Sequence, residues 1–256
     1  MIDVNVSLSR WPFRRLPLDE TTALVSALKR QGFVQAWAGS FDALLHRDVA
    51  AVNHRLAAEC RERGGGLLQP FGTVDPTLLD WRDDVRRCHE EHEMPGLRLH
   101  PNYHGYTLDD PRFAALLDEA AGRAMLVQIV VAMEDVRTQH PLVRAPRVDL
   151  SPLPKLVEDR PELQVIILNS SLLPATEPLR ALFRTERVWA DTAMLEGVAG
   201  IERFVAEFRA EALLIGSHAP FFCLDAAPLK LQESELKPAD LAAITEGNAR
   251  GLLWVP

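Results

Sequence analysis

Residues 125–131 read Met-Leu-Val-Gln-Ile-Val-Val, and Gln128 is the one polar residue among them. A strand with one face in water alternates apolar and polar residues, whereas this run is apolar on both faces. Such runs are typical of a parallel sheet that helices cover on both sides. The sequence therefore predicts a buried strand here, within an α/β fold.

Short apolar runs of this kind recur along the chain, and most are followed by apolar residues at helical spacing. The predicted strands cover residues 2–7, 33–38, 67–74, 96–100, 125–131, 163–169, 187–192 and 212–217. The predicted helices cover residues 18–30, 47–63, 77–91, 110–122, 153–160, 176–183, 197–209 and 237–253. Eight strand–helix units in 256 residues predict a (β/α)8 TIM barrel.

The chain contains no linker or low-complexity stretch, so we predict a single domain over residues 1–256. A doubly wound open sheet also alternates strand and helix. No G-x-G-x-x-G motif follows a predicted strand, which weakens that alternative. A long insertion at residues 134–150 is predicted to form either a lid over the barrel mouth or a subunit contact.

The composition narrows the classes of partner. The formal net charge is −8 and no dense basic cluster is present, so we expect no nucleic-acid partner. Three scattered cysteines (Cys60, Cys88 and Cys223) indicate a reducing compartment without disulfides. The N-terminus lacks a signal-peptide pattern and no apolar run reaches bilayer length, so we predict a cytoplasmic protein with no membrane partner.

TIM-barrel active sites lie at the carboxyl ends of the strands, where this chain places several polar residues. Along the first strand, Asp3, Asn5 and Ser7 are predicted to share the face that points into the barrel. Val4, Val6 and Leu8 would then pack beneath the helices. The polar residues predicted at the other strand ends are Asp75, His100, Gln128, Asn169, Ser170, Ser171, Asp191, Thr192, Ser217 and His218.

Five stretches at these strands and in the last helix resemble the amidohydrolase superfamily, in its amidohydrolase-related branch of lactonases and nonoxidative decarboxylases. They are Ile-Asp-Val-Asn-Val-Ser at 2–7, Gly-Leu-Arg-Leu-His-Pro at 96–101, Leu-Val-Gln-Ile at 126–129, Ile-Gly-Ser-His-Ala-Pro at 215–220 and Gly-Asn-Ala-Arg at 247–250. The resemblance runs nearly end to end and implies a TIM barrel. It also suggests a homodimer, since barrels of this family often pair.

The family pattern implies a divalent metal held by a His-x-His pair on strand one, by histidines on strands five and six, and by an aspartate on strand eight. This chain has Asn5 and Ser7, Gln128, Asn169 or a neighbour, and His218 at those positions. Neutral oxygens are poor zinc ligands beside imidazole, thiolate or carboxylate. We therefore predict no cofactor, with zinc or another divalent metal only if a rearranged site holds it.

The residues that remain can still carry chemistry. Arg98 could clamp a substrate carboxylate through two parallel hydrogen bonds, and a histidine near neutral pKa can act as general base or acid. The alternative is that these side chains only satisfy loop and barrel groups. The predicted catalytic residues are His218, His100 and His104. The predicted substrate-binding residues are Asn5, Ser7, Arg98, Tyr103, Gln128, Arg137, His140, Asn169 and Asp191.

Three functions are compatible with these residues. The first is a metal-independent hydrolase for a lactone, ester or amide in a small carboxylated molecule, with His218 or His100 as general base. The second is a rearranged metal-dependent hydrolase or decarboxylase. The third is a barrel without chemistry that binds a small molecule or a partner protein.

Overall fold

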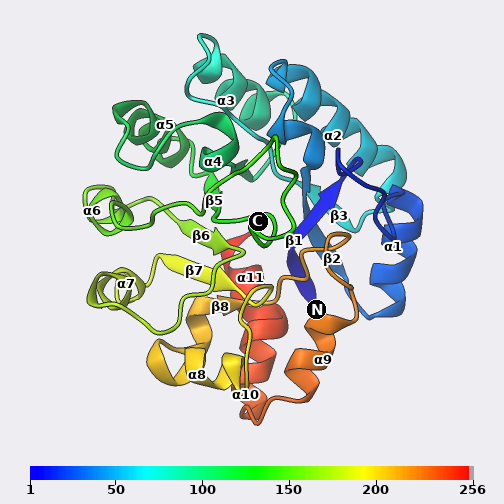
Figure 1. The fold of residues 1–256 in the computed structure, drawn as a ribbon, viewed down its shortest axis with the longest axis vertical. Helices are drawn as coiled ribbons and strands as arrows, with labels where there is room; N and C mark the ends of the chain where they lie inside the picture. Colours follow the sequence, from blue (N-terminus) through cyan, green and yellow to red (C-terminus); the bar gives the residue numbers. More distant parts are fainter. Residues whose placement is uncertain (254–256) are drawn as a thin grey trace.

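In the computed structural model, which describes residues 1–253, parallel strands form the centre of the molecule and helices surround them (Figure 1). The strands are β1 (Ile2–Leu8), β2 (Gln35–Ser40), β3 (Leu68–Pro70), β4 (Gly96–Leu99), β5 (Leu126–Val130), β6 (Val165–Leu168), β7 (Val188–Asp191) and β8 (Leu213–Leu214). Each pairs in parallel with the next in two runs, β1 to β3 and β4 to β8. Each of the eight lies within two residues of its predicted limits except β3 and β8, which end earlier.

Backbone hydrogen bonds close the two runs into one barrel. Between β8 and β1, Val4 N donates to Ile215 O (3.0 Å) and Ser7 N donates to Ala219 O (2.8 Å). Between β3 and β4, Gly72 N donates to Gly96 O (3.1 Å). Both seams of the sheet are therefore bonded, which confirms the predicted TIM barrel and excludes an open sheet.

The helices follow the predicted order. They are α1 (Thr21–Arg30), α2 (Val49–Arg63), α3 (Trp81–Glu90), α5 (Pro111–Ala121), α6 (Leu153–Glu158), α7 (Glu177–Phe183) and α8 (Gly200–Glu207). The predicted last helix is α10 (Pro238–Ala242), a π-helical turn (η3, Ala243–Gly247) and α11 (Asn248–Leu252). Elements not predicted are η1 (Phe41–Leu44), α4 (Pro101–His104), η2 (Ala210–Ala212) and α9 (Ala226–Gln232).

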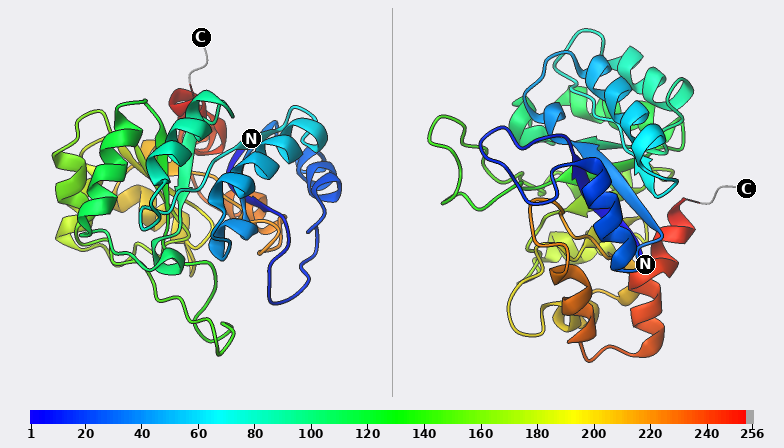
Figure 2. Two further views of the ribbon diagram at one scale, coloured as in Figure 1. Left: turned by 90° about the horizontal axis from the view of Figure 1, so that it is seen from above. Right: turned by 90° about the vertical axis from the view of Figure 1, so that its right-hand side faces the viewer.

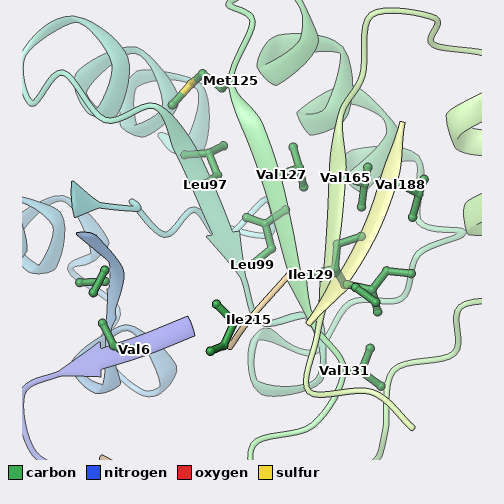
Figure 3. Close-up of a cluster of buried hydrophobic side chains, with 14 of the residues drawn as sticks. Val6, Leu97, Leu99, Met125, Val127, Ile129, Val131, Val165, Val188 and Ile215 are labelled. Atoms are coloured by element: carbon green, nitrogen blue, oxygen red, sulfur yellow. The ribbon is translucent and has the colours of Figure 1, made fainter. Parts of the chain in front are cut away.

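Apolar residues pack on both sides of the barrel wall. The side beneath the helices includes Leu97, Leu99, Val127 and Ile129 of β4 and β5, which Figure 3 shows in one cluster with Val6. The barrel interior holds a second cluster of large side chains. Its strand residues include Ile2, Val4, Trp37, Leu126, Val130, Ile166, Leu168 and Leu214.

The expectation that Val4 packs beneath the helices is wrong. Val4 belongs to the interior cluster, whereas Val6 and Leu8 belong to the helix-side cluster. The register between β1 and β2 shifts between Asp3 and Val6, which marks a bulge. A bulge breaks the alternation of side chains along a strand, so Asp3 cannot be assigned to the face of Asn5 and Ser7 by counting.

Three long connections lie on one side of the barrel in both views of Figure 2: residues 9–20 after β1, residues 131–152 after β5 and residues 215–225 after β8. The connection after β5 projects from the body, and it contains no helix or strand. Among residues 1–253, no helix is both long enough and apolar enough to cross a bilayer.

Candidate active site

Arg98 is buried inside the barrel, with 1% of its surface exposed. Its guanidinium donates to Gln128 Oε1 (2.7 Å) and to the carbonyl oxygens of Val6 (2.6 Å), Val4 (3.1 Å) and Trp37 (2.9 Å). Gln128 Nε2 donates in turn to Val4 O (3.1 Å). These donors tie β1, β2, β4 and β5 together, so the prediction that Arg98 clamps a substrate carboxylate is not supported.

Gln128 lies too deep for the predicted contact with substrate, because its exposed fraction is 0% and both ends of its amide are bonded to the barrel. Gly39 on β2 provides the space that Arg98 occupies. A Cβ on Gly39 would lie 2.7 Å from Arg98 Cδ, closer than real Cβ contacts. The pair of Arg98 and Gln128 therefore belongs to the barrel wall beneath the site.

Above this layer, polar side chains from β1, β6 and β7 meet. Asn5 Nδ2 donates to Asn169 Oδ1 (2.7 Å) and to Asp191 Oδ2 (2.6 Å), and the backbone N–H of Asn169 donates to Asp191 Oδ1 (2.9 Å). Each of the three residues is at most 2% exposed. Gly216 permits the meeting, because a Cβ there would lie 2.6 Å from Asp191 Oδ2 and 3.1 Å from Asn5 Cβ.

Two buried carboxyl groups lie in this network. Burial raises the pKa of Asp3 to about 6 and that of Asp191 to about 6, against partial compensation by hydrogen bonds and by the Arg98 charge. Asp3 Oδ1 accepts from the backbone N–H groups of Asn5 (3.0 Å) and Ser217 (3.0 Å), which holds β1 to β8. Burial lowers the pKa of Arg98 to about 10, so it remains a cation at neutral pH.

His218 joins the network through Asn169. Its Nε2 lies 2.8 Å from Met133 O, and since a carbonyl only accepts, this nitrogen carries the proton. Its Nδ1 then accepts from Asn169 Nδ2 at 3.3 Å. Burial lowers the pKa of His218 to about 4. Both nitrogens are engaged, which disfavours the predicted role of His218 as general base.

The prediction that Asp191 orients His218 directly also needs correction, because Asn169 lies between them. Asn169 and His218 adopt left-handed backbone conformations, with φ of 56° and 54°. These conformations are uncommon outside glycine, and Asn and His are among the residues that adopt them more often. They place both side chains in the network directly after β6 and near the end of β8.

His100 presents the opposite case. It is 3% exposed, at the end of β4, and neither ring nitrogen has a hydrogen-bond partner among the described residues. Burial lowers the pKa of His100 well below its usual value, and the neighbouring His104, Arg98 and His218 add to the effect. The imidazole is therefore neutral, with one donor and one acceptor free.

His104 lies one turn along α4, with its ring centroid 6.2 Å from that of His100. Its Nε2 donates to Ala43 O (2.9 Å), which leaves Nδ1 as an acceptor. Nδ1 and the buried hydroxyl of Tyr106 have no partner among the described residues. The structure thus brings the two predicted histidines together and adds Tyr106, which the sequence did not single out.

An aromatic layer covers these groups. Trp11 packs edge-on against Phe13, Phe41 and Phe221, with centroids 4.9 to 5.5 Å apart. Phe221 also stacks on His218 at 5.1 Å. The layer comes from the connections after β1, β2 and β8, so the site is closed in this conformation. The adjacent pair Phe221-Phe222 directly after β8 was the available sequence signal.

Of the other predicted contacts, Ser7 is buried at the end of β1 and Tyr103 is partly buried on α4. Burial raises the pKa of Tyr103, and Glu134 nearby adds to the rise. Arg137 and His140 do not reach the site. Arg137 is exposed and bonded to Asp135, and His140 stacks on Phe13 at 5.2 Å, outside the aromatic layer.

Comparison with known proteins agrees with this geometry. The amidohydrolase family model matches residues 9–253. This chain belongs to the amidohydrolase family. No curated protein matches its sequence.

Three solved structures share the fold of this amidohydrolase family member. 2,6-Dihydroxybenzoate decarboxylase from Rhizobium is 14% identical over 98% of each chain, with a TM-score of 0.73. 5-Carboxyvanillate decarboxylase from Sphingomonas paucimobilis is 12% identical over 100% of this chain and 99% of that chain (TM-score 0.77). A dihydroxybenzoic acid decarboxylase from Polaromonas sp. JS666 with bound manganese is 12% identical over 98% and 96% (TM-score 0.70). Identities this low establish the fold alone.

The side chains of this family member do not fit a divalent metal. Within residues 1–253, no three His, Cys, Asp or Glu side chains are grouped so that they could hold an ion. The predicted replacements Asn5, Asn169 and His218 bond to one another and to Asp191, and Gln128 Oε1 is bonded to Arg98. The rearranged metal site built from His100, His104 and His218 therefore finds no support in this geometry.

Proposed function

We propose that this protein is a hydrolase that works without a metal ion and uses His100 as its general base. The observation that carries the proposal is the buried, neutral imidazole of His100, whose two nitrogens lack partners among the described residues. It lies at the carboxyl end of a barrel strand, where TIM-barrel enzymes keep their chemistry. The proposed substrate is a lactone, ester or amide in a small carboxylated molecule.

In the proposed step, a water molecule attacks the substrate carbonyl while His100 accepts a proton from the water. The new carbon–oxygen bond forms, the bond to the leaving oxygen or nitrogen breaks, and the proton passes from the imidazolium to the leaving group. Burial keeps the imidazole in the neutral form that can accept a proton, but it also weakens the base. The oxyanion that develops beside it would stabilise the imidazolium.

Removal of His100 tests this proposal. Wild type and His100→Gln would be assayed on a panel of lactones, aryl esters and anilides that carry a carboxylate, after dialysis against a chelator. We expect wild-type turnover to survive chelation, and His100→Gln to lose roughly 10²- to 10⁴-fold, the usual contribution of a general base. His89→Gln, which changes an exposed histidine on α3, is the matched control and should retain full activity.

Equal turnover of wild type and His100→Gln would overturn the assignment of the base. Loss of turnover on chelation, with recovery on adding manganese or zinc, would overturn the metal-free mechanism. The solved relatives are named as decarboxylases, so the panel also includes dihydroxybenzoates, with carbon dioxide release as the readout. Release from those acids without any hydrolysis would replace the proposed reaction with decarboxylation.

A further inference from the structure

Arg14 lies at the outer rim of the aromatic layer, in the connection after β1. Its guanidinium carbon is 5.0 Å from the centroid of Phe221, the ring that also stacks on His218. Its side chain is 46% exposed. Arg14 is therefore a cation that is in contact with solvent and one ring away from the buried site.

The hydrogen-bonding capacity of Arg14 is nearly unused. Within the described residues it has one acceptor, Glu134 Oε2, at the long distance of 3.5 Å. The next residue, Arg15, donates through two nitrogens to Asp19 (2.5 and 2.8 Å), and Arg137 does the same to Asp135 (2.9 and 2.6 Å). Of these rim arginines, Arg14 alone keeps a planar pair of N–H donors open for a carboxylate.

Glu134 is the internal anion that competes for this cation. Its side chain is 3% exposed, and its other recorded partner is the hydroxyl of Thr138 at 3.2 Å. A buried carboxylate needs compensating charge or donors, so Glu134 attracts the Arg14 guanidinium. The long distance between them means that the pair is loosely made, and an entering carboxylate with good geometry can replace it.

We propose that Arg14 is the residue that recognises the substrate carboxylate and so determines specificity, with Glu134 as its competitor. This assignment rests on the proposed function for the class of substrate, and it gives Arg14 the role that Arg98 cannot fill. The guanidinium binds the carboxylate through two parallel hydrogen bonds, and the face of Phe221 supports a planar group beside it.

Binding of benzoate and of its neutral isostere benzamide tests the proposal without any need for turnover. Affinities would be measured by protein-detected NMR titration of wild type, Arg14→Gln, Arg14→Lys and Glu134→Gln. We expect wild type to prefer benzoate, and Arg14→Gln to weaken benzoate roughly 10- to 100-fold, the range of charge-assisted hydrogen bonds. Arg14→Lys should retain part of the preference, because it keeps the charge but loses the paired donors.

Glu134→Gln should bind benzoate more tightly than wild type, since the competing anion is gone. Arg15→Gln changes the neighbouring, fully paired arginine and should leave both affinities unchanged. Equal binding of benzoate and benzamide by wild type, or equal loss in Arg14→Gln and Arg15→Gln, would overturn the assignment. A carboxylate preference that depends on Arg14 would stand even if no hydrolysis is found, and hydrolysis that needs His100 but not Arg14 would sink this inference alone.

Discussion

Arg98 and His100 lie two residues apart at the end of β4, yet their polar atoms have different environments. Arg98 is bonded on all sides to the barrel, whereas His100 has no partner among residues 1–253. The sequence could predict that both lie near the mouth, because strand ends are visible in the pattern of apolar runs. It could not predict which atoms stay free, because that depends on where carbonyls of β1 and β2, distant in the chain, come to lie.

If Arg98 is structural, conservative replacement should damage the fold itself. We expect Arg98→Lys to lower the free energy of unfolding by about 3–5 kcal/mol, since an ammonium cannot serve four separated acceptors and leaves buried groups unpaired. Chemical denaturation followed by far-UV circular dichroism measures this. A variant as stable as wild type that had merely lost ligand affinity would return Arg98 to the role of substrate clamp.

At the scale of elements, the apolar runs predicted the barrel, because each strand is buried on both faces and helices separate the strands. They did not predict α9 or the bulge in β1. Helix α9 is seven residues long and contains Pro228, so it has little helical periodicity to detect. A bulge adds one residue to one partner of a strand pair and leaves no mark in the composition of the strand.

The segment after β8 offers a prediction at this scale, because Gly216 is where β8 meets β1 and β7. Gly216→Ala should lower the free energy of unfolding by about 1–3 kcal/mol, since the added methyl group overlaps Asp191 and crowds Asn5. Gly251→Ala is the control, because a Cβ there meets nothing within 4 Å on α11 and should stabilise the helix by about 0.5–1 kcal/mol. Equal effects of the two changes on thermal denaturation would contradict the crowding seen around Gly216.

For the whole molecule, the buried network links stability to pH with two opposite signs. The pKa of Asp191 is about 6 when folded against an ordinary value of 3.8, so the folded state binds the proton more tightly. This carboxyl group therefore reduces stability as pH rises from about 4 to 6. The pKa of His218 is about 4 against 6.5, so this imidazole reduces stability as pH falls from 6.5 to 4.

Single replacements should separate the two effects. Relative to wild type, Asp191→Asn should gain stability as pH rises from 4 to 6, and His218→Gln should gain stability as pH falls across the same range. Each change should be on the order of 1–3 kcal/mol across the window. Urea denaturation at several pH values measures the slopes, and these do not depend on the constant loss caused by missing contacts. If both variants ran parallel to wild type, the two groups would titrate as they do in the unfolded chain. The network beneath the aromatic layer would then be open to water, and His100 would lose the burial on which its proposed role depends.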